Sequence, residues 1–167
     1  MDYTAKIKTL EEIKVIADKL KKQNKKIVTT NGSFDLLHPG HIHSLNFAKS
    51  LGDILIVGLN SDASIKKYKS PSRPIIDEQG RAVMLANLAC VDYVVVIDKP
   101  EIAVPLVRTV RPDVHVKGEE YKENLIEKND VKKAGGKIVY APLLPGLSTT
   151  KIIKKILSQE STFSINS

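Results

Sequence analysis

Short apolar runs alternate with stretches of helical period along most of the chain. Five runs rich in β-branched residues have the length and composition of strands. Between them, apolar side chains recur every three or four residues, as they do on one face of an amphipathic helix. Most of the runs are continuously apolar, which is typical of parallel strands that helices cover on both faces. The predicted strands cover residues 26–30, 53–59, 93–97, 113–117 and 137–141.

The predicted helices have recognisable ends. Thr9 and Glu12 have the spacing of a capping box, so a helix is expected there, over about 9–22. Gly52 and the pair Gly135-Gly136 follow other periodic stretches and end them. The remaining helices are predicted over 40–51, 62–68, 78–90, 100–110 and 148–158, and one or two short helices are predicted within 122–134.

Strands that alternate with helices predict a single doubly wound α/β domain with a Rossmann-like fold. We expect a five-stranded parallel sheet in the order 3-2-1-4-5, with helices on both faces, over residues 1–160. Residues 161–167 are expected to form a disordered tail. In this order the chain changes direction between strands 1 and 4, and ligands bind at the carboxyl ends of the strands at such a point. The loops that leave these two strands are 31–41 and 117–121.

The composition is that of a globular protein of 167 residues with a formal net charge of +7, which favours anionic partners such as nucleotides and sugar phosphates. The lysine-rich segment 19–26 contains no aromatic residue, so nucleic acid is not predicted as a partner. The single cysteine, Cys90, excludes an internal disulfide. The N-terminus is polar and the apolar runs are too short to span a bilayer, so we expect a cytoplasmic protein with no membrane partner.

Residues 31–45 follow the first predicted strand and contain His38 and His41, on either side of Pro39-Gly40. A strand, a glycine-containing turn and a helix start supply free backbone N–H groups and the positive end of a helix dipole, which together bind phosphate. Two imidazoles can donate hydrogen bonds to phosphoryl oxygens as charge develops during transfer. Asp35 orients a neighbouring group, positions Mg²⁺ or caps the helix entry. We therefore assign His38 and His41 to catalysis, and to nucleotide binding the residues Asn31, Gly32, Ser33, Phe34, Asp35 and Gly40.

The two other histidines are predicted to have no catalytic role. His43 lies two residues after His41, so it points to another side of the helix and is expected on the surface. His115 lies inside a predicted strand and is expected to be packed. No cysteine or acidic partner stands at ligand spacing from the histidines, so no metal-binding residue is predicted.

Three further clusters can bind anions. Hydroxyl groups open the last predicted helix, a glycine after the fourth strand permits close backbone approach, and basic residues are scattered between them. An enzyme that joins two polyanions needs cations, and Lys66 or Lys67, Arg73 and Arg81 are candidates, of which we assign Lys66 and Arg81 to catalysis. The further nucleotide-binding candidates are Lys117, Gly118, Glu120, Tyr121, Leu147, Ser148, Thr149 and Thr150.

Over about residues 10–158 the chain resembles the His-x-Gly-His nucleotidyltransferases, and within them the adenylyltransferases that activate heptose 1-phosphate. The resemblance implies direct in-line transfer of AMP from ATP, with Mg²⁺, to D-glycero-β-D-manno-heptose 1-phosphate, giving ADP-heptose and pyrophosphate. It also implies a separate sugar kinase that supplies the acceptor, and a homo-oligomer is expected. The segments that carry the resemblance are Thr30–His41, Leu51–Asp53, Asn60–Ser64, Ser72–Pro74, Val91-Asp92, Val116–Gly118 and Ser148–Thr150.

Two other functions stay open. The chain can be a cytidylyltransferase for a small phosphorylated alcohol such as glycerol 3-phosphate, although Leu144–Leu147 lacks the arginine that those enzymes typically carry there. It can also be a nucleotide- or nucleic-acid-binding module without catalysis, against which the intact His38 and His41 argue. The segment Gly118–Tyr121 departs from the Gly-Gly-Asp-Tyr that is usual in the heptose branch.

Overall fold

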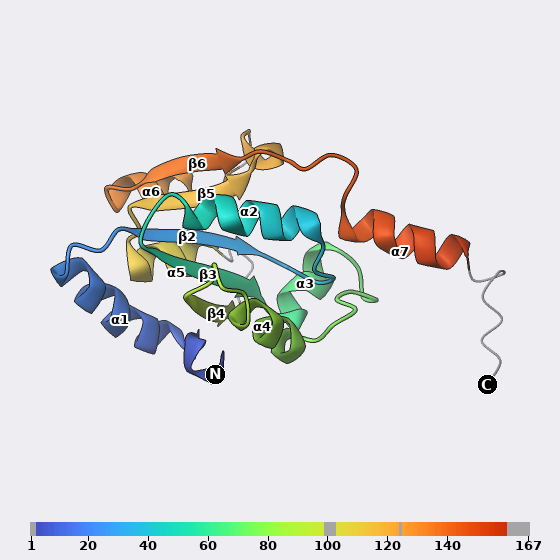
Figure 1. The fold of residues 1–167 in the computed structure, drawn as a ribbon, viewed down its shortest axis with the longest axis horizontal. Coiled ribbons are helices and arrows are strands. Elements are labelled where there is room, and N and C mark those ends of the chain that lie inside the picture. Colours follow the sequence, from blue (N-terminus) through green and yellow to red (C-terminus); the bar gives the residue numbers. More distant parts are fainter. Residues whose placement is uncertain (1–2, 99–102, 124, 160–167) are drawn as a thin grey trace.

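One parallel sheet organises the part of the chain that the computed structural model describes, which is residues 3–98, 103–123 and 125–159. The sheet has six strands in the order β1-β4-β3-β2-β5-β6, and neighbouring strands pair in parallel (Figure 1). The strands are β1 (Ile7–Lys8), β2 (Ile27–Gly32), β3 (Ile54–Asn60), β4 (Tyr93–Ile97), β5 (Val114–Gly118) and β6 (Lys137–Ala141).

The predicted five-stranded sheet is wrong, because β1 adds a sixth strand at the edge beside β4. This strand has two residues, and Ile7 and Lys8 pair with Val94 and Val95. The strand has a single apolar residue, Ile7, between Lys6 and Lys8, so the pattern contained no apolar run that could predict it. Lys6 fixes the segment by donating a hydrogen bond from Nζ to the Val91 carbonyl at 2.8 Å. The five strands that were predicted take consecutive places in the observed order, β4-β3-β2-β5-β6.

The helices begin where side chains cap them. At the first, Thr9 and Glu12 form the predicted capping box, with the Thr9 amide donating to Glu12 Oε2 at 2.8 Å and the Glu12 amide donating to Thr9 Oγ1 at 3.2 Å. The helix predicted over 78–90 was too long, since the helix found there, α4, covers Glu78–Ala86. Within 122–134, where one or two short helices were predicted, the described residues form one short helix, α6, over Lys128–Lys133. The helices are α1 (Leu10–Lys22), α2 (Pro39–Lys49), α3 (Asp62–Tyr68), α4 (Glu78–Ala86), α5 (Ala103–Val110), α6 (Lys128–Lys133) and α7 (Thr149–Ser158), with 3-10 turns at Tyr3–Lys6 and Glu119–Tyr121.

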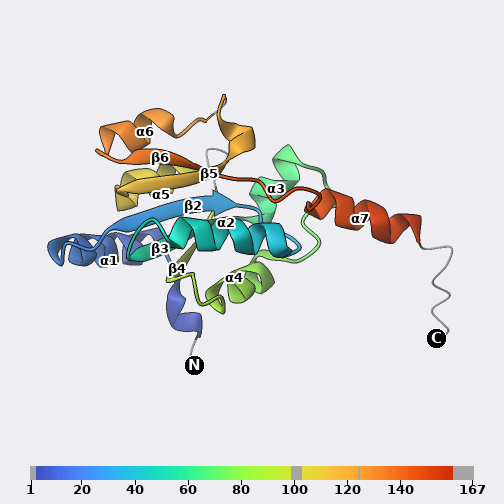
Figure 2. The same ribbon diagram turned by 45° about the horizontal axis from the view of Figure 1, so that its top comes forward.

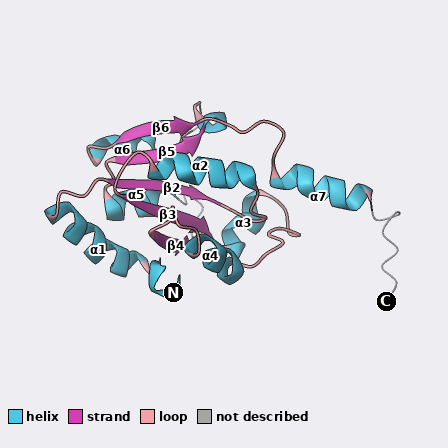
Figure 3. Ribbon diagram, in the orientation of Figure 1, coloured by secondary structure: helices cyan, strands magenta, loops and turns pink. Residues whose placement is uncertain are grey.

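Helices cover both faces of the sheet, which Figure 3 colours by element type. Because neighbouring residues of a strand point to opposite faces, Val28 packs with α2 and α4 while Ile27 packs with α1 and α5. Both side chains are fully buried, which explains why the strands are continuously apolar. No helix in the described residues is long and apolar enough to cross a membrane. The predicted tail, 161–167, lies outside the described residues.

The site lies where the chain changes direction across the sheet. Strand β2 pairs with β3 on one side and with β5 on the other, so the loops after β2 and β5 leave neighbouring strands at the same edge. Helix α7 starts near the beginning of α2 and projects away from the sheet, as the two views in Figures 1 and 2 show. The carboxyl edge therefore collects the β2 loop, the β5 loop and two helix N-termini.

Candidate active site

His38 and His41 stand at the N-terminus of α2 with their rings stacked. The ring centroids are 3.8 Å apart and the ring planes differ by 21°. His38 is the N-cap residue with extended backbone, and Pro39 occupies the first helical turn, so His41 follows on the same first turn. Phe34 closes the other side of His41 with an edge contact at 5.3 Å between centroids. We call these three residues the histidine cluster.

The histidine cluster is short of hydrogen-bond partners. Within the described part of the chain, Nδ1 of His38 and Nδ1 of His41 are both buried and unpaired. Burial lowers the pKa of His41 to about 4, and the neighbouring His38 and Lys69 add to that shift. Burial likewise lowers the pKa of His38. Buried polar atoms normally have partners, so two neighbouring buried ring nitrogens without one set this cluster apart.

The loop after β2 holds this geometry through Phe34 and Asp35. Phe34 has a φ of 45°, in the left-handed region that non-glycine residues seldom adopt. Asp35 is buried and its oxygens accept from Arg73 Nε at 2.6 Å and from the amides of Ile75 and Ile76 at 2.8 and 3.1 Å. Of the three roles predicted for Asp35, which were to orient a neighbouring group, to position Mg²⁺ or to cap the helix entry, these bonds fit the first, because the carboxylate holds Arg73 and the 73–76 loop.

The N-terminus of α7 lies beside the N-terminus of α2. A Cβ placed on Gly40 would be 3.7 Å from Leu147 Cβ, which puts the two helix starts in contact range. Ser148 caps α7 by accepting from the Lys151 amide at 3.2 Å, and Thr149 is buried. Thr150, in the same turn, is exposed. Two helix dipoles therefore converge near the histidines, as the sequence predicted for a phosphate site.

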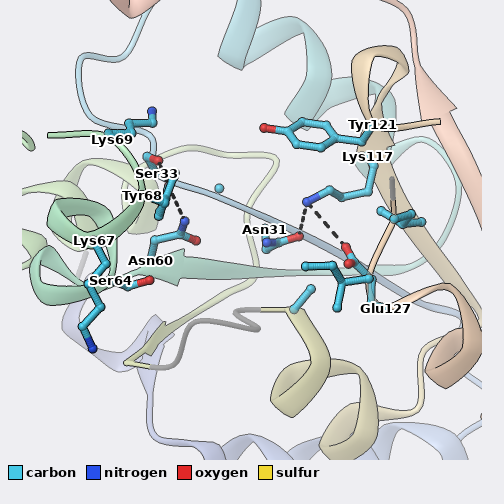
Figure 4. A pocket seen from close by; sticks show the side chains of 14 residues that line it. Asn31, Ser33, Asn60, Ser64, Lys67, Tyr68, Lys69, Lys117, Tyr121 and Glu127 are labelled. Carbon is cyan, nitrogen blue, oxygen red and sulfur yellow. Dashed lines mark hydrogen bonds and ion pairs between the residues drawn. The ribbon is translucent and has the colours of Figure 1, made fainter. Parts of the chain in front are cut away.

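A pocket of about 330 Å³ opens at the same edge, on the other face of β2. Asn31 belongs to that face, because a Cβ on Gly58 would touch both Asn31 and Leu106 of α5. Figure 4 shows Lys67, Lys69 and Tyr68 on one side of the pocket and Lys117, Tyr121 and Glu127 on the other. The lining residues are Asn31, Gly32, Ser33, Asn60, Ser64, Lys67, Tyr68, Lys69, Ala103, Lys117, Tyr121, Leu125, Ile126 and Glu127.

A connected set of polar groups forms the wall of the pocket beside β5. Lys117 donates from Nζ to Asn31 Oδ1 at 2.9 Å, lies 3.5 Å from Glu127 Oε1, and stands 4.5 Å from the centroid of the Tyr121 ring. Behind it, His115 Nε2 is 3.1 Å from the same Glu127 oxygen, and His115 Nδ1 is 2.8 Å from Thr29 Oγ1. His115 is fully buried, as the sequence predicted. We call Asn31, Lys117, Glu127, His115 and Thr29 the pocket network.

The pocket network fixes the charges of its members. Burial would raise the pKa of the Glu127 carboxyl, but the hydrogen bond to His115 and the charge of Lys117 outweigh it and lower that pKa to about 2. Burial lowers the pKa of His115, more than the bond to Glu127 raises it. A neutral His115 beside an ionised carboxylate must carry its proton on Nε2, so Nδ1 accepts from the Thr29 hydroxyl.

The two predicted basic catalytic residues do not line the pocket. Lys66 is exposed on α3, and it is Lys67 that contributes to the lining. Arg81 is fully buried, and its guanidinium donates to the carbonyls of Ser33 at 2.5 Å and Asn60 at 2.8 Å, to the Ile76 carbonyl at 2.9 Å and to Asp62 Oδ1 at 2.6 Å. Arg81 therefore has a structural role: it holds together the Ser33, Asn60 and Ile76 backbone, which lies between the histidine cluster and the pocket.

Most of the other predicted residues lie at the carboxyl edge of the sheet, but not all of them line the pocket. Gly118 and Glu120 do not line the pocket, and the Glu120 carboxylate folds over Gly118. His43 is exposed, as predicted. Sequence reasoning missed Glu127 and Tyr68, which hydrogen-bonds through its hydroxyl to Ser33 Oγ at 2.5 Å and accepts from Asn60 Nδ2 at 2.7 Å. Only the buried His115 hinted that a partner such as Glu127 had to exist.

Comparison with known proteins gives a consistent result. Residues 29–155 match the cytidylyltransferase-like family. The Bifunctional protein HldE of Syntrophotalea carbinolica is 46% identical over 160 residues, which are 95% of this chain and 32% of that protein. The Bifunctional protein HldE of Campylobacter jejuni is 47% identical over 156 residues, 93% of this chain and 32% of that protein. The chain thus spans about a third of the length of these curated relatives.

Two solved structures share the fold. The lipopolysaccharide core biosynthesis protein from Thermoplasma volcanium superimposes with a TM-score of 0.59 at 29% identity, over 72% of this chain and 97% of that one. The pantoate-beta-alanine ligase from Francisella tularensis, complexed with beta-gamma ATP and beta-alanine, gives a TM-score of 0.63 at 21% identity, over 91% of this chain and 77% of that one. At the lower identity the likeness concerns the fold alone.

Proposed function

The chain belongs to the cytidylyltransferase-like family, and on that premise we propose that it transfers AMP from ATP to a sugar 1-phosphate, D-glycero-β-D-manno-heptose 1-phosphate. The products are ADP-heptose and pyrophosphate. The observation that carries the proposal is the stacked pair His38 and His41 between two helix N-termini, whose Nδ1 atoms find no partner among the described residues. The identity to HldE proteins, and the fold shared with a lipopolysaccharide core biosynthesis protein, support the sugar as acceptor.

In-line transfer places the two substrates on opposite sides of the reacting phosphorus. We assign the triphosphate of ATP to the histidine cluster and to the start of α7, where Ser148, Thr149 and Thr150 stand. The acceptor phosphate then approaches from the pocket on the other face of β2, where Lys67, Lys69 and Lys117 supply positive charge. Gly32 and Ser33 lie between the two sides, where the α-phosphate is expected to be.

The chemical step needs no covalent enzyme intermediate. An oxygen of the sugar 1-phosphate attacks the α-phosphorus of ATP, a new P–O bond forms, and the bond to the β-phosphate oxygen breaks as pyrophosphate leaves. His38 and His41 donate hydrogen bonds to phosphoryl oxygens as charge develops there, which lowers the barrier because the donors are already in place. Gly118 and Glu120, on the β5 loop outside the pocket, remain assigned to the nucleotide. Asn31, Lys117 and Tyr121, which the sequence assigned to the nucleotide, line the pocket, and we reassign them to the acceptor.

Mg²⁺ enters this proposal as part of the substrate MgATP. The described residues contain no group of three His, Cys, Asp or Glu side chains that could hold a metal ion. Asp35, the one acidic residue of the predicted motif, already accepts from Arg73 and two backbone amides. The phosphate oxygens and water therefore supply the ligands of the ion.

The test is pyrophosphate release by the purified protein across a panel of sugar 1-phosphates, with ATP and then with CTP. We expect turnover with the heptose 1-phosphate and a higher kcat/KM for ATP than for CTP. A clear preference for CTP with glycerol 3-phosphate would instead make the protein a cytidylyltransferase for small phosphorylated alcohols. Salt-dependent binding of DNA or RNA without any turnover would make it a binding module.

The partners of the reaction follow from its chemistry. A sugar 1-phosphate must be supplied by an enzyme activity that phosphorylates a sugar, so we propose that a sugar kinase acts upstream. Self-association of this chain stays a prediction, and sedimentation velocity of the purified protein measures it.

A further inference from the structure

Glu127 is an ionised carboxylate in the wall of the acceptor pocket. Only 4% of the residue is exposed, yet it is one of the lining residues. Two donors, His115 Nε2 and Lys117 Nζ, approach one of its oxygens, Oε1, at 3.1 and 3.5 Å. Taking a carboxylate out of water costs several kcal/mol even when it is paired, and apolar packing at such a position is often as stable. A charge kept at this cost, facing a pocket, indicates a group that binds a ligand.

The chemistry around Glu127 suits a polyhydroxylated ligand. An ionised carboxylate only accepts hydrogen bonds, and the Lys117 ammonium only donates them. Next to this pair the lining is apolar, with Tyr121, Leu125 and Ile126. Sugars present hydroxyl groups at their edges and C–H groups on their faces, so they match a wall that combines an acceptor, a donor and an apolar surface.

We propose that Glu127 is the specificity-determining residue for the acceptor, and that its carboxylate accepts hydrogen bonds from hydroxyl groups of the sugar. The inference rests on the proposed function, because it places a sugar phosphate in the pocket. The phosphate of the acceptor lies at the other end, where Lys67 and Lys69 stand opposite Glu127 across the pocket (Figure 4). A small phosphorylated alcohol would not extend from these lysines to Glu127 as a sugar does.

His115 and Thr29 are positioning residues behind Glu127. Both are fully buried in neighbouring strands, and the register of β2 with β5 sets Thr29 opposite His115. The Thr29 hydroxyl holds one ring nitrogen at 2.8 Å, which directs the other toward Glu127. This second layer fixes the carboxylate rotamer, as an ordered supporting shell does at a precise binding site.

The test compares Glu127→Gln with the unchanged enzyme in steady-state kinetics. The amide keeps the shape but loses the charge and one acceptor, so kcat/KM for the sugar 1-phosphate should fall about 10- to 100-fold, mainly through KM. ATP affinity, measured by calorimetry, should stay within about twofold, because ATP binds at the histidine cluster. Glu123→Gln is the matched control, since Glu123 is exposed on the same segment and does not line the pocket.

Deoxy analogues of the acceptor separate recognition from a structural role. With the unchanged enzyme, removing the hydroxyl that Glu127 binds should lower kcat/KM at least about tenfold, since a site built for a hydroxyl rejects the analogue that lacks it. With Glu127→Gln the same analogue and the full sugar should differ less than about threefold, because the partner is altered. Equal discrimination by both enzymes against every deoxy analogue would refute the assignment.

A second variant keeps the test decisive if Glu127→Gln does not fold. His115→Gln retains an N–H donor toward Glu127 and should keep most of the discrimination among deoxy analogues, whereas His115→Leu should lose it. Identical discrimination by both His115 variants would refute the positioning role. If the unchanged enzyme releases no pyrophosphate with any sugar 1-phosphate, the proposed function itself fails. An active enzyme with an unchanged Glu127→Gln variant refutes only the role of Glu127.

Discussion

The histidine cluster and the pocket network lie on opposite faces of β2, and they differ in how far their polar groups are paired with other protein groups. In the histidine cluster, His38 and His41 stack on each other, and their buried Nδ1 atoms have no partner in the part of the chain that the structure describes. In the pocket network, Glu127, His115 and Lys117 are joined by contacts of 2.8 to 3.5 Å that run from Thr29 to Asn31. One side is prepared to receive charge, and the other already holds it.

This difference matches the two kinds of ligand that we propose. A triphosphate brings its own negative charge, so it stabilises donors that the free protein leaves unpaired. A sugar is neutral apart from its phosphate, so the protein must supply fixed charges and an orientation for its hydroxyl groups. We therefore expect the protonation state of the histidine cluster to change when ATP binds. The protonation state of the pocket network should stay the same when the acceptor binds.

The largest expected effect concerns Arg81, which supports the wall between the two sides. Arg81→Ala removes four hydrogen bonds and leaves Asp62 without its cation, so the free energy of unfolding should fall by about 3–5 kcal/mol. Urea denaturation measures it. Lys14→Ala is the control, because the Lys14–Asp18 pair is exposed and should contribute little to stability. A loss for Arg81→Ala as small as that of the control would remove Arg81 from this role.

The second prediction removes one donor from the histidine cluster. His41→Ala should lower kcat about 10²–10³-fold, because His41 stabilises charge that develops in the transition state. The fold should persist, since Nδ1 of His41 makes no hydrogen bond in the described structure. His43→Ala, exposed on the same helix, should leave kcat unchanged. Pyrophosphate release by His41→Ala at the unchanged rate would contradict the proposed catalytic role.

The sequence predicted well those features that depend on residues near each other along the chain. Five apolar runs gave β2 to β6, and residues 31–41 gave a histidine pair at a helix start. Strand β1 was missed because a strand of two residues owes its existence to pairing with β4. Glu127 was missed for a similar reason, since α6 begins next to it and only the fold brings it to His115.

Charged residues were the hardest to place from sequence. Asp35 and Arg81 have the chemistry of a metal ligand and an anion-binding cation, but both are buried and satisfied by protein groups. Nothing in a local pattern shows whether a carboxylate or guanidinium will meet backbone amides and carbonyls after folding. Burial decides the role here, and burial is a property of the tertiary structure.

The third prediction compares two neighbouring lysines of α3. Lys67 lines the pocket, so Lys67→Ala should lower kcat/KM for the sugar 1-phosphate about tenfold, equivalent to about 1.4 kcal/mol. Lys66 is exposed outside the lining, so Lys66→Ala should be close to the unchanged enzyme. Steady-state kinetics with both variants measure the difference. A larger effect at Lys66 would return the catalytic assignment to the residue that the sequence suggested.

The smallest expected effect is the uptake of a fraction of a proton when ATP binds. It tests the difference between the histidine cluster and the pocket network directly. The pKa of His41 lies at about 4 in the free protein, below its ordinary value of 6.5, because burial and the neighbouring His38 and Lys69 oppose the imidazolium. A bound triphosphate favours the imidazolium, so it should raise that pKa. The bound state then holds more protons than the free state, so ATP affinity should weaken as pH rises above about 4.

Calorimetry of ATP binding at pH 6, in two buffers of different ionisation enthalpy, measures this uptake. We expect proton uptake by the unchanged enzyme and less uptake by His41→Asn.

His41 also links protonation to the stability of the fold. Since its folded pKa is depressed, the folded state binds fewer protons than the unfolded state between pH 6.5 and about 4, so stability falls as pH falls through that range. His41→Asn should flatten this dependence of stability on pH.

Binding of the sugar 1-phosphate should take up no proton at the pocket network, because Glu127 is already ionised and His115 neutral. Uptake of a proton by Glu127 or His115 on acceptor binding would show that the two sides do not differ in the way proposed.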